Sequence, residues 1–298
     1  MRVTQKMMQD RLVSALQAQR RRLDALQTQA VTQKRVTKPS DDPVAADQVV
    51  TQGAGLDRTR QYLRNVSHLN AQLRAAEGTL TSASSLIERV RSLAIAQSNS
   101  ALTSNERTIA ANEVQALRDQ LLQLANAKFG GNSLFAGRRT DVVPFSLQAD
   151  GTVSYAGDDG AIELQVGDST RIAGTSPGSR VFQSTRGEVD IFTEIQTLIT
   201  ALNSNNVTGI EAQIDRMTES FEQVEREVSS VGSRMALLEV MEQGLNDVEL
   251  TLQTALSETQ DVDLTKALSD LASQQSNLEV SMAVAAQVLP LSLLDFLR

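Results

Sequence analysis

The chain has 298 residues and a formal net charge of −8, and it contains no cysteine, no tryptophan and a single histidine. Thiol nucleophiles, disulfides and thiolate metal sites are therefore excluded, and a site built from several histidines cannot form. Apolar residues make up 41% of the chain but aromatic residues only 3%. Apolar surface supplied mainly by Leu, Val, Ile, Ala and Met is typical of long helices packed along narrow seams.

The charge and the distribution of apolar residues also exclude two classes of partner. A net negative charge makes nucleic acid and anionic membrane surfaces poor partners. No stretch approaches the roughly 18 apolar residues of a membrane span, and the first residues lack the apolar stretch of a secretory signal. We therefore expect no nucleic-acid binding, no membrane insertion and no classical secretory route.

The first segment of the chain has the spacing of a helix with one heptad seam. Its seam positions alternate in steps of four and three, at Leu12, Leu16, Gln19, Leu23, Leu26 and Ala30. The pattern stops at Lys38 to Pro43, where two prolines disfavour helix in the residues that precede them. We expect a second helix to begin at Pro43, because proline is acceptable at the first position of a helix.

The same periodicity continues in the middle of the chain. A seam runs from Leu63 to Leu93, and Thr103 followed by Glu106 is a capping box that begins a third helix, expected to end at Gly130-Gly131. Further seams predict helices over 191–202 and 210–252. A final helix has its seam at Leu264, Leu268, Leu271, Gln275, Leu278, Met282, Ala285 and Leu289, before Pro290 is expected to break it.

Between Gly130 and Gly187 the composition changes, because ten of the sixteen glycines lie there. Alternating runs such as 152–155 and 162–166 predict short strands, with hairpin turns at Asp150-Gly151 and Asp159-Gly160. We therefore predict a small β domain inserted into an otherwise helical chain.

These elements predict a mainly α protein with a small inserted β domain. Seams at both ends, with no nearby partner of their own length, imply that the N- and C-terminal helices pair as a coiled coil. We expect an elongated molecule with a middle helical bundle and a distal β domain. The predicted domains are residues 1–45 plus 258–298 (terminal coiled coil, poorly ordered in the free monomer), 46–130 plus 188–257 (helical rod or bundle) and 131–187 (β domain).

Chemical motifs are weak. The run 174–178 matches the G-x-S-x-G nucleophile elbow, but such a hydrolase needs a histidine after Ser176, and His68 precedes it. Asp41-Asp42 lies in a turn bounded by prolines, where capping and turn roles are favoured over acid-base work. Arg20, Arg21 and Arg22 are interpreted as solvated charges or salt links to a neighbouring subunit. We expect no catalytic, cofactor or metal site.

Seams left unpaired within a chain are assembly surfaces, so we predict that the function of this chain depends on them. The predicted assembly residues are Leu12, Leu16, Leu23, Leu26, Leu264, Leu268, Leu271, Leu278 and Met282.

Several motifs resemble the bacterial flagellin family, and within it the proteins of the hook-filament junction. The run 34–46 is similar to the family's N-terminal signature, with Pro39, Ser40, Asp41, Asp42 and Pro43 in the form typical of junction proteins. The runs 132–137 and 177–182 resemble the junction proteins' small β domain, and 261–267 resembles the family's entry into the last helix.

The resemblance implies a structural component of the bacterial flagellum, an adaptor that links another hook-associated protein to flagellin. It further implies export through the flagellar type III apparatus, a cytoplasmic export chaperone that binds near the C-terminal helix, and a ring of about eleven self-associating subunits. The alternative within the family is a short flagellin that forms the filament itself.

Overall fold

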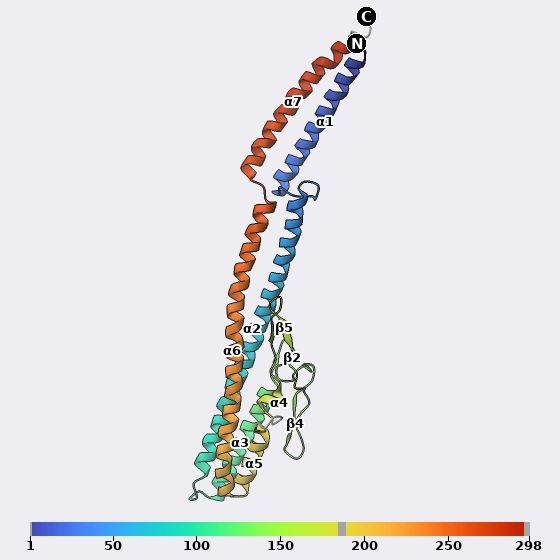
Figure 1. Cartoon of the computed structure of the whole chain (residues 1–298). Helices are drawn as coiled ribbons and strands as arrows, with labels where there is room; N and C mark the ends of the chain where they lie inside the picture. The colour runs from blue at the N-terminus through green and yellow to red at the C-terminus, as the bar shows by residue number, and fades with distance from the viewer. Residues whose placement is uncertain (1, 184–188, 295–298) are drawn as a thin grey trace. The chain divides into compact units, whose positions relative to one another are not determined.

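The fold is that of a computed structural model, which describes residues 2–183 and 189–294 and confirms a mainly α chain with a small β region. Its helices (Figure 1) are α1 (Arg2–Thr32), α2 (Pro43–Gln97), α3 (Ser104–Ala125), α4 (Gly178–Val181), α5 (Ile191–Asn203), α6 (Val207–Gln260) and α7 (Leu264–Leu294). Its strands are β1 (Lys128–Phe129), β2 (Asn132–Ser133), β3 (Phe145–Leu147), β4 (Val153–Tyr155), β5 (Glu163–Gln165) and β6 (Arg171–Ala173).

Contacts divide the chain into two compact units. The terminal unit comprises residues 1–58 and 248–298, and the middle unit comprises residues 59–247. Helices α2 and α6 contribute to both units, because each runs without a break through a boundary. The three domains expected from the sequence remain a prediction.

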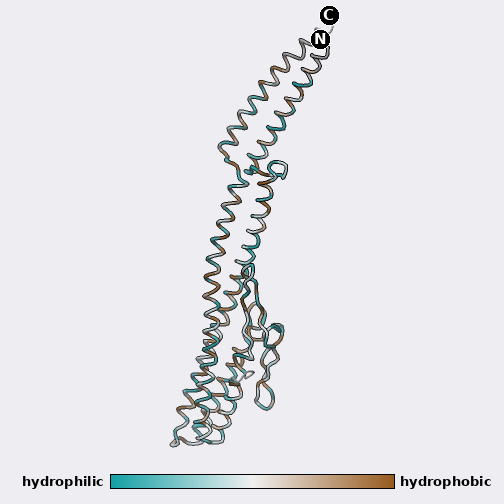
Figure 2. Tube along the Cα trace, viewed as in Figure 1, coloured by the Kyte–Doolittle hydropathy of each residue, from teal (hydrophilic) through white to brown (hydrophobic). Residues whose placement is uncertain are grey.

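The middle unit is built around heptad seams, which Figure 2 shows as apolar residues recurring along each long helix. The seam of α6 is the most regular: Ile210, Met217, Val224, Val231 and Leu238 recur every seven residues, and each is fully buried. Such spacing keeps one face of a helix against its neighbours along its whole length. The predicted long helix over 210–252 is confirmed, and it extends from residue 207 to residue 260.

The connection from α2 to α3 is held by a buried arginine. Thr103 and Glu106 form the predicted capping box, each side chain accepting the other's backbone N–H. Next to it Arg107, only 1% exposed, donates to the carbonyl of Asn99 at 2.7 Å and to the side chain of Asn205. Because a buried guanidinium without acceptors is costly, these bonds fix the turn between α2 and α3 against the turn that precedes α6.

The β region consists of three separate antiparallel ribbons. The turn at Asp150-Gly151 is confirmed, since Leu147 pairs with Val153 and Gly151 has a φ of +86° that favours glycine. The prediction for Gly130-Gly131 was wrong: α3 ends earlier, at Ala125, and both glycines take positive φ in the turn between β1 and β2. A pair of glycines ends a helix or turns a hairpin equally well, so composition alone does not separate the two.

An aromatic cluster anchors the β region to α5. The ring of Phe145 lies 5.0 Å from Tyr155, 5.5 Å from Phe182 and 5.7 Å from Phe192. A Cβ at Gly178 would lie 2.6 Å from the Phe145 ring, so this glycine permits the close packing. Burial raises the pKa of Tyr155 to about 12, which keeps its hydroxyl neutral as it donates to backbone carbonyls.

Two other details of the sequence prediction were wrong. The last helix does not break at Pro290 but continues to Leu294. Asp159-Gly160 forms no hairpin turn, because β4 and β5 do not pair. Instead the neighbouring Asp158 carboxylate accepts the backbone N–H groups of Arg138 and Gly160, which turns the chain without a ladder.

Ser176 is a buried structural residue, 4% exposed. Its hydroxyl donates to Glu227 at 2.5 Å and accepts from Arg234 at 2.9 Å, and Arg234 also pairs with Glu227 at 2.8 Å. The sequence analysis did not identify Glu227 as a partner of Ser176. Because Arg234 neutralises it and the serine is inaccessible, the group fastens the β region to α6 and does not form a nucleophile elbow.

Candidate assembly interface

Helix α1 packs against α7 through the seam expected from its sequence, and the two helices lie side by side in Figure 1. Its partly buried positions from residue 10 onward are Leu12, Leu16, Gln19, Leu23, Leu26, Gln29 and Ala30, and the positions between them are exposed. A leucine occupies four of these seven positions, so the stripe is narrow and its centre is well defined. All four leucines of the predicted assembly set on α1 therefore lie in this seam.

Helix α7 faces α1 with a different set of residues from the one expected. Its buried and partly buried positions are Ala267, Leu271, Gln274, Leu278, Ser281 and Ala285. Of the predicted set on α7, Leu271 and Leu278 lie in this seam. Leu264, Leu268 and Met282 do not, since they are 40%, 50% and 45% exposed.

Helical geometry explains the difference. Leu268 and Met282 each follow a seam residue by one position, which rotates them about 100° around the helix. The apolar arc of α7 is therefore wider than the strip that α1 covers, and α1 packs on one edge of it. We call the uncovered residues Leu264, Leu268 and Met282 the open flank. Within the terminal unit, the open flank is apolar surface available to another helix.

The seam between α1 and α7 is weak where it is polar. Lys34 and Asp261 form an antiparallel bridge beside the end of α1 and the start of α7. The Oε1 atom of Gln19 is buried without a hydrogen-bond partner. An unpaired amide oxygen costs about 1–3 kcal/mol, so the seam is stabilised mainly by its few leucine layers.

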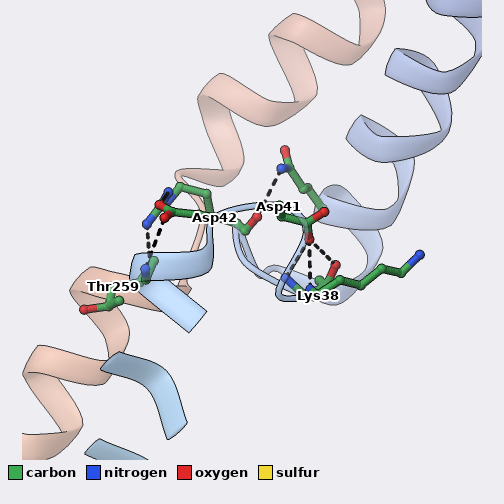
Figure 3. A network of polar contacts seen from close by, with 8 residues as sticks. Lys38, Asp41, Asp42 and Thr259 are labelled. Atoms are coloured by element: carbon green, nitrogen blue, oxygen red, sulfur yellow. Dashed lines mark hydrogen bonds and ion pairs between the residues drawn. The ribbon is translucent and has the colours of Figure 1, made fainter. Parts of the chain in front are cut away.

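The segment from Gln33 to Asp42, here called the signature loop, is a network of hydrogen bonds to two aspartates (Figure 3). The Asp41 carboxylate accepts from the backbone N–H of Lys38 at 2.9 Å and from Thr37 at 3.0 and 3.1 Å. The Asp42 carboxylate caps α2 by accepting the N–H of Ala45 at 3.1 Å and pairs with Arg35 at 3.2 Å. The loop is therefore an ordered turn, and its paired carboxylates have capping roles.

The signature loop, which connects α1 to α2, is also bonded to the connection between α6 and α7, far away in the sequence. The N–H of Arg35 donates to the carbonyl of Gln260 at 2.6 Å, and the N–H of Val262 donates to the carbonyl of Gln33 at 3.0 Å. The Arg35 guanidinium reaches the carbonyl of Thr259 at 2.8 Å. These bonds hold the end of α1 beside the start of α7, so they set the register of the seam.

The other family-motif residues have simpler places in the loop. Pro43 is the first residue of α2, as expected, and Pro39 and Ser40 are exposed in the turn before it. Sequence reasoning did not assign the roles of Gln33 and Arg35. The only available signal was their position just before the proline pair.

Acidification is expected to weaken the signature loop. The pKa of Asp41 is lowered from 3.8 mainly by the backbone N–H groups of Lys38 and Thr37, and that of Asp42 mainly by the N–H of Ala45 and then by Arg35. A lowered pKa in the folded state gives stability that is complete above the unfolded pKa and is lost as the pH falls through the folded pKa. The protection of the loop's backbone amides against hydrogen exchange should therefore be constant from about pH 5 to 8 and fall below about pH 4.

Hydrogen exchange at the amides of Arg35 and Val262, corrected for the intrinsic rate at each pH, measures this effect. In a variant with Asp41→Asn and Asp42→Asn, these two amides should be less protected at neutral pH, and their protection should change little as the pH falls. An acid profile identical to that of the unchanged chain would show that other groups control the loop.

Gln33 is the one strained position in the loop, with a φ of +59°. The left-handed conformation costs an L residue roughly 1–2 kcal/mol. Glycine avoids this steric cost, but its greater loss of backbone entropy on folding offsets part of the gain. We expect Gln33→Gly to raise the protection of the Val262 amide about two- to fivefold, and the β-branched Gln33→Val to lower it by more. Equal protection in the two variants would contradict the strain at this position.

In the described part of the chain, no three or more Asp, Glu or His side chains are grouped so as to hold a metal ion. None of the described helices combines the length and the apolar character needed to cross a membrane.

Comparison with known proteins shows which proteins this chain resembles. Residues 3–140 match the model of the bacterial flagellin N-terminal helical region. The chain is 27% identical to flagellar hook-associated protein 3 of Salmonella typhimurium, over 100% of both chains. The chain is therefore similar to the flagellin family over residues 3–140, and this match contains the signature loop and the whole of α2 and α3.

Two further comparisons show the same similarity. A flagellin of Halalkalibacterium halodurans is 26% identical, over 89% of this chain and 88% of the flagellin. A solved structure of a putative flagellar hook-associated protein from Vibrio parahaemolyticus has the same fold, with a TM-score of 0.68, 20% identity, and coverage of 74% of this chain and 100% of that one. Both curated relatives carry the names of structural flagellar proteins.

Proposed function

We propose that the chain is a structural component of the bacterial flagellum that acts as the adaptor at the hook-filament junction. The observation that carries this proposal is the similarity to flagellar hook-associated protein 3, which spans 100% of both chains. The small β region, with the runs 132–137 and 177–182, supports the junction role over that of a filament subunit.

The mechanism of assembly rests on the two faces of α7. One edge packs on α1 within the chain, and the open flank receives a helix of a neighbouring subunit. Each of Leu264, Leu268 and Met282 then loses its exposed apolar surface, which contributes about 25 cal/mol per Å² removed from water. Stacked subunits would carry the terminal helices on an inner tube, with the helical bundle outside it and the β region facing solvent.

The partners follow from this position. On one side lies another hook-associated protein, and on the other lies flagellin, both contacted through the same kind of helical seam. Repetition of one heterologous interface closes into a ring, for which the family implies about eleven subunits. Export through the flagellar apparatus requires the seams to remain unassembled in the cytoplasm, so a chaperone that covers α7 belongs to the same proposal.

The second candidate is a short flagellin, favoured by the 26% identity to a flagellin over most of both chains. The two functions differ in whether assembly ends. A filament subunit adds to its own end indefinitely, whereas an adaptor forms a layer of fixed size that binds a different protein on each side.

Seeded assembly separates them. Purified chain is added to isolated hook ends that carry the preceding hook-associated protein and, separately, to sheared filament ends, followed by flagellin and electron microscopy. A short collar on hook ends that stops growing and then supports flagellin extension is the expected result. Long filaments of this chain from either seed would show that it is a flagellin.

A further inference from the structure

The arginine cluster, Arg20–Arg22 on α1, has no acidic side chain bonded to it in the described part of the terminal unit. All three side chains are exposed, and none forms a hydrogen bond or ion pair with a described residue. Asp24, one turn further along, forms no ion pair with them either. Three adjacent positive charges without partners are unusual in a chain whose net charge is −8.

The helix that packs on α1 does not supply the missing charge. Counted along the two helices from their adjacent ends, Thr32 and Leu264, the arginine cluster lies level with about residues 274–276 of α7. The stretch 271–278 contains neither Asp nor Glu, and the flanking acids Asp270 and Glu279 are exposed and form no ion pair with a described residue. Pairing of α1 with α7 inside one chain therefore leaves the cluster facing solvent.

An acidic counterpart exists in the same unit but out of register. Residues 258–270, here called the acidic segment, contain four acids and one lysine. Asp261 accepts from Ser257, and Asp263 caps α7. Glu258 and Asp270 are exposed and form no bond with any described residue.

The offset between the two segments has a direct consequence. Counted in the same way, Asp270 lies level with about residue 26, and the rest of the acidic segment lies beside the end of α1 and the signature loop. Within one chain the acidic segment is therefore not level with the arginine cluster. At 1.5 Å per residue, a second copy shifted along the helix axis by about 10–25 Å brings the acidic segment level with the cluster. The complementary charges therefore fit a neighbouring copy displaced along the helix better than they fit the chain itself.

We propose that the arginine cluster of one subunit binds the acidic segment of a second copy of the chain. This inference rests on the proposed function and adds to it the contact that fixes the axial offset between subunits. Exposed ion pairs contribute little individually, but complementary charges steer association and penalise the wrong register. The open flank would supply the apolar contact between two subunits, and the complementary charges would determine their axial offset.

A charge swap between copies tests the pairing. One variant carries Arg20→Glu, Arg21→Glu and Arg22→Glu, a second carries Glu258→Lys and Asp270→Lys, and a third carries all five changes. The first two should each incorporate at hook ends about tenfold less than the unchanged chain, because like charges meet at every contact. An equimolar mixture of the two, and the third variant alone, should recover, since opposite charges meet again.

The matched control reverses three exposed basic residues of the middle unit, Arg74→Glu, Lys128→Glu and Arg226→Glu, and should incorporate normally. Protection of the Val262 amide checks that α1 and α7 remain paired in every variant. Binding to vesicles of phosphatidylglycerol is measured in parallel.

The outcomes are distinct. Recovery in both the mixture and the five-change variant supports the pairing between copies. Normal incorporation of the arginine variant, or a loss that neither combination rescues, overturns it, and so does a loss of vesicle binding without a loss of incorporation. Failure of the unchanged chain to form any collar overturns the proposed function itself, which separates the two failures.

Discussion

Replacement of Leu271 and Leu278 by Asp is expected to abolish incorporation at hook ends and to separate α1 from α7. Leu278 is only 8% exposed, and both leucines lie in the strip that α1 covers. Loss of leucine burial together with an unpaired carboxylate in the seam costs roughly 3 kcal/mol or more at each site. A short seam that already contains an unsatisfied Gln19 cannot absorb that cost.

The middle unit should remain folded in this variant, because its core uses neither residue. Circular dichroism of the full chain and hydrogen exchange in α1 and α7 report the two parts separately. A variant with Leu271→Met and Leu278→Met, which conserves apolar volume, should behave as the unchanged chain. Normal collars from the Asp variant would show that the seam has no role in assembly.

A second pair of substitutions, Leu268→Asp and Met282→Asp, should also abolish incorporation but leave the α1–α7 pairing intact. Both residues belong to the open flank and are about half exposed in the free chain. Surface substitutions of this kind usually change stability by less than about 0.5 kcal/mol. In an assembled subunit the same carboxylates would be buried against a neighbouring helix, which costs several kcal/mol at every repeated contact.

The matched control lies on the same helix. Val280 and Val284 are 63% and 49% exposed, and they lie on the opposite side of α7 from the open flank. Val280→Asp with Val284→Asp should incorporate like the unchanged chain. If both pairs of substitutions blocked incorporation equally, the open flank would not be the specific contact.

The two seams show how far periodicity predicts packing. On α1 the leucines define a narrow stripe, so their spacing identified the buried face correctly. On α7 the same spacing identified an apolar arc, but Ala267, Gln274 and Ser281 occupy the edge that α1 covers. Hydrophobic periodicity identifies the apolar face of a helix. When that face is wide, the periodicity does not indicate which edge of it packs against the neighbouring helix.

The signature loop shows a different limit. Its prolines and aspartates mark a turn and a helix cap from local rules alone, and the structure places them there. Its bonds from Arg35 to Thr259 and Gln260 join segments more than 220 residues apart, which no local rule detects. The same holds for Ser176 and Glu227, where the sequence revealed the serine but not its carboxylate partner.

In the proposed assembly, subunits contact one another through the open flank of α7. Because the chain contains no cysteine, a single Met282→Cys change gives one unique attachment point for a maleimide photocrosslinker. The equivalent Leu147→Cys change on exposed β3 serves as the comparison. Irradiation of collars on hook ends should crosslink subunits from position 282 and leave position 147 unlinked. Crosslinks from position 147 with none from position 282 would contradict the account.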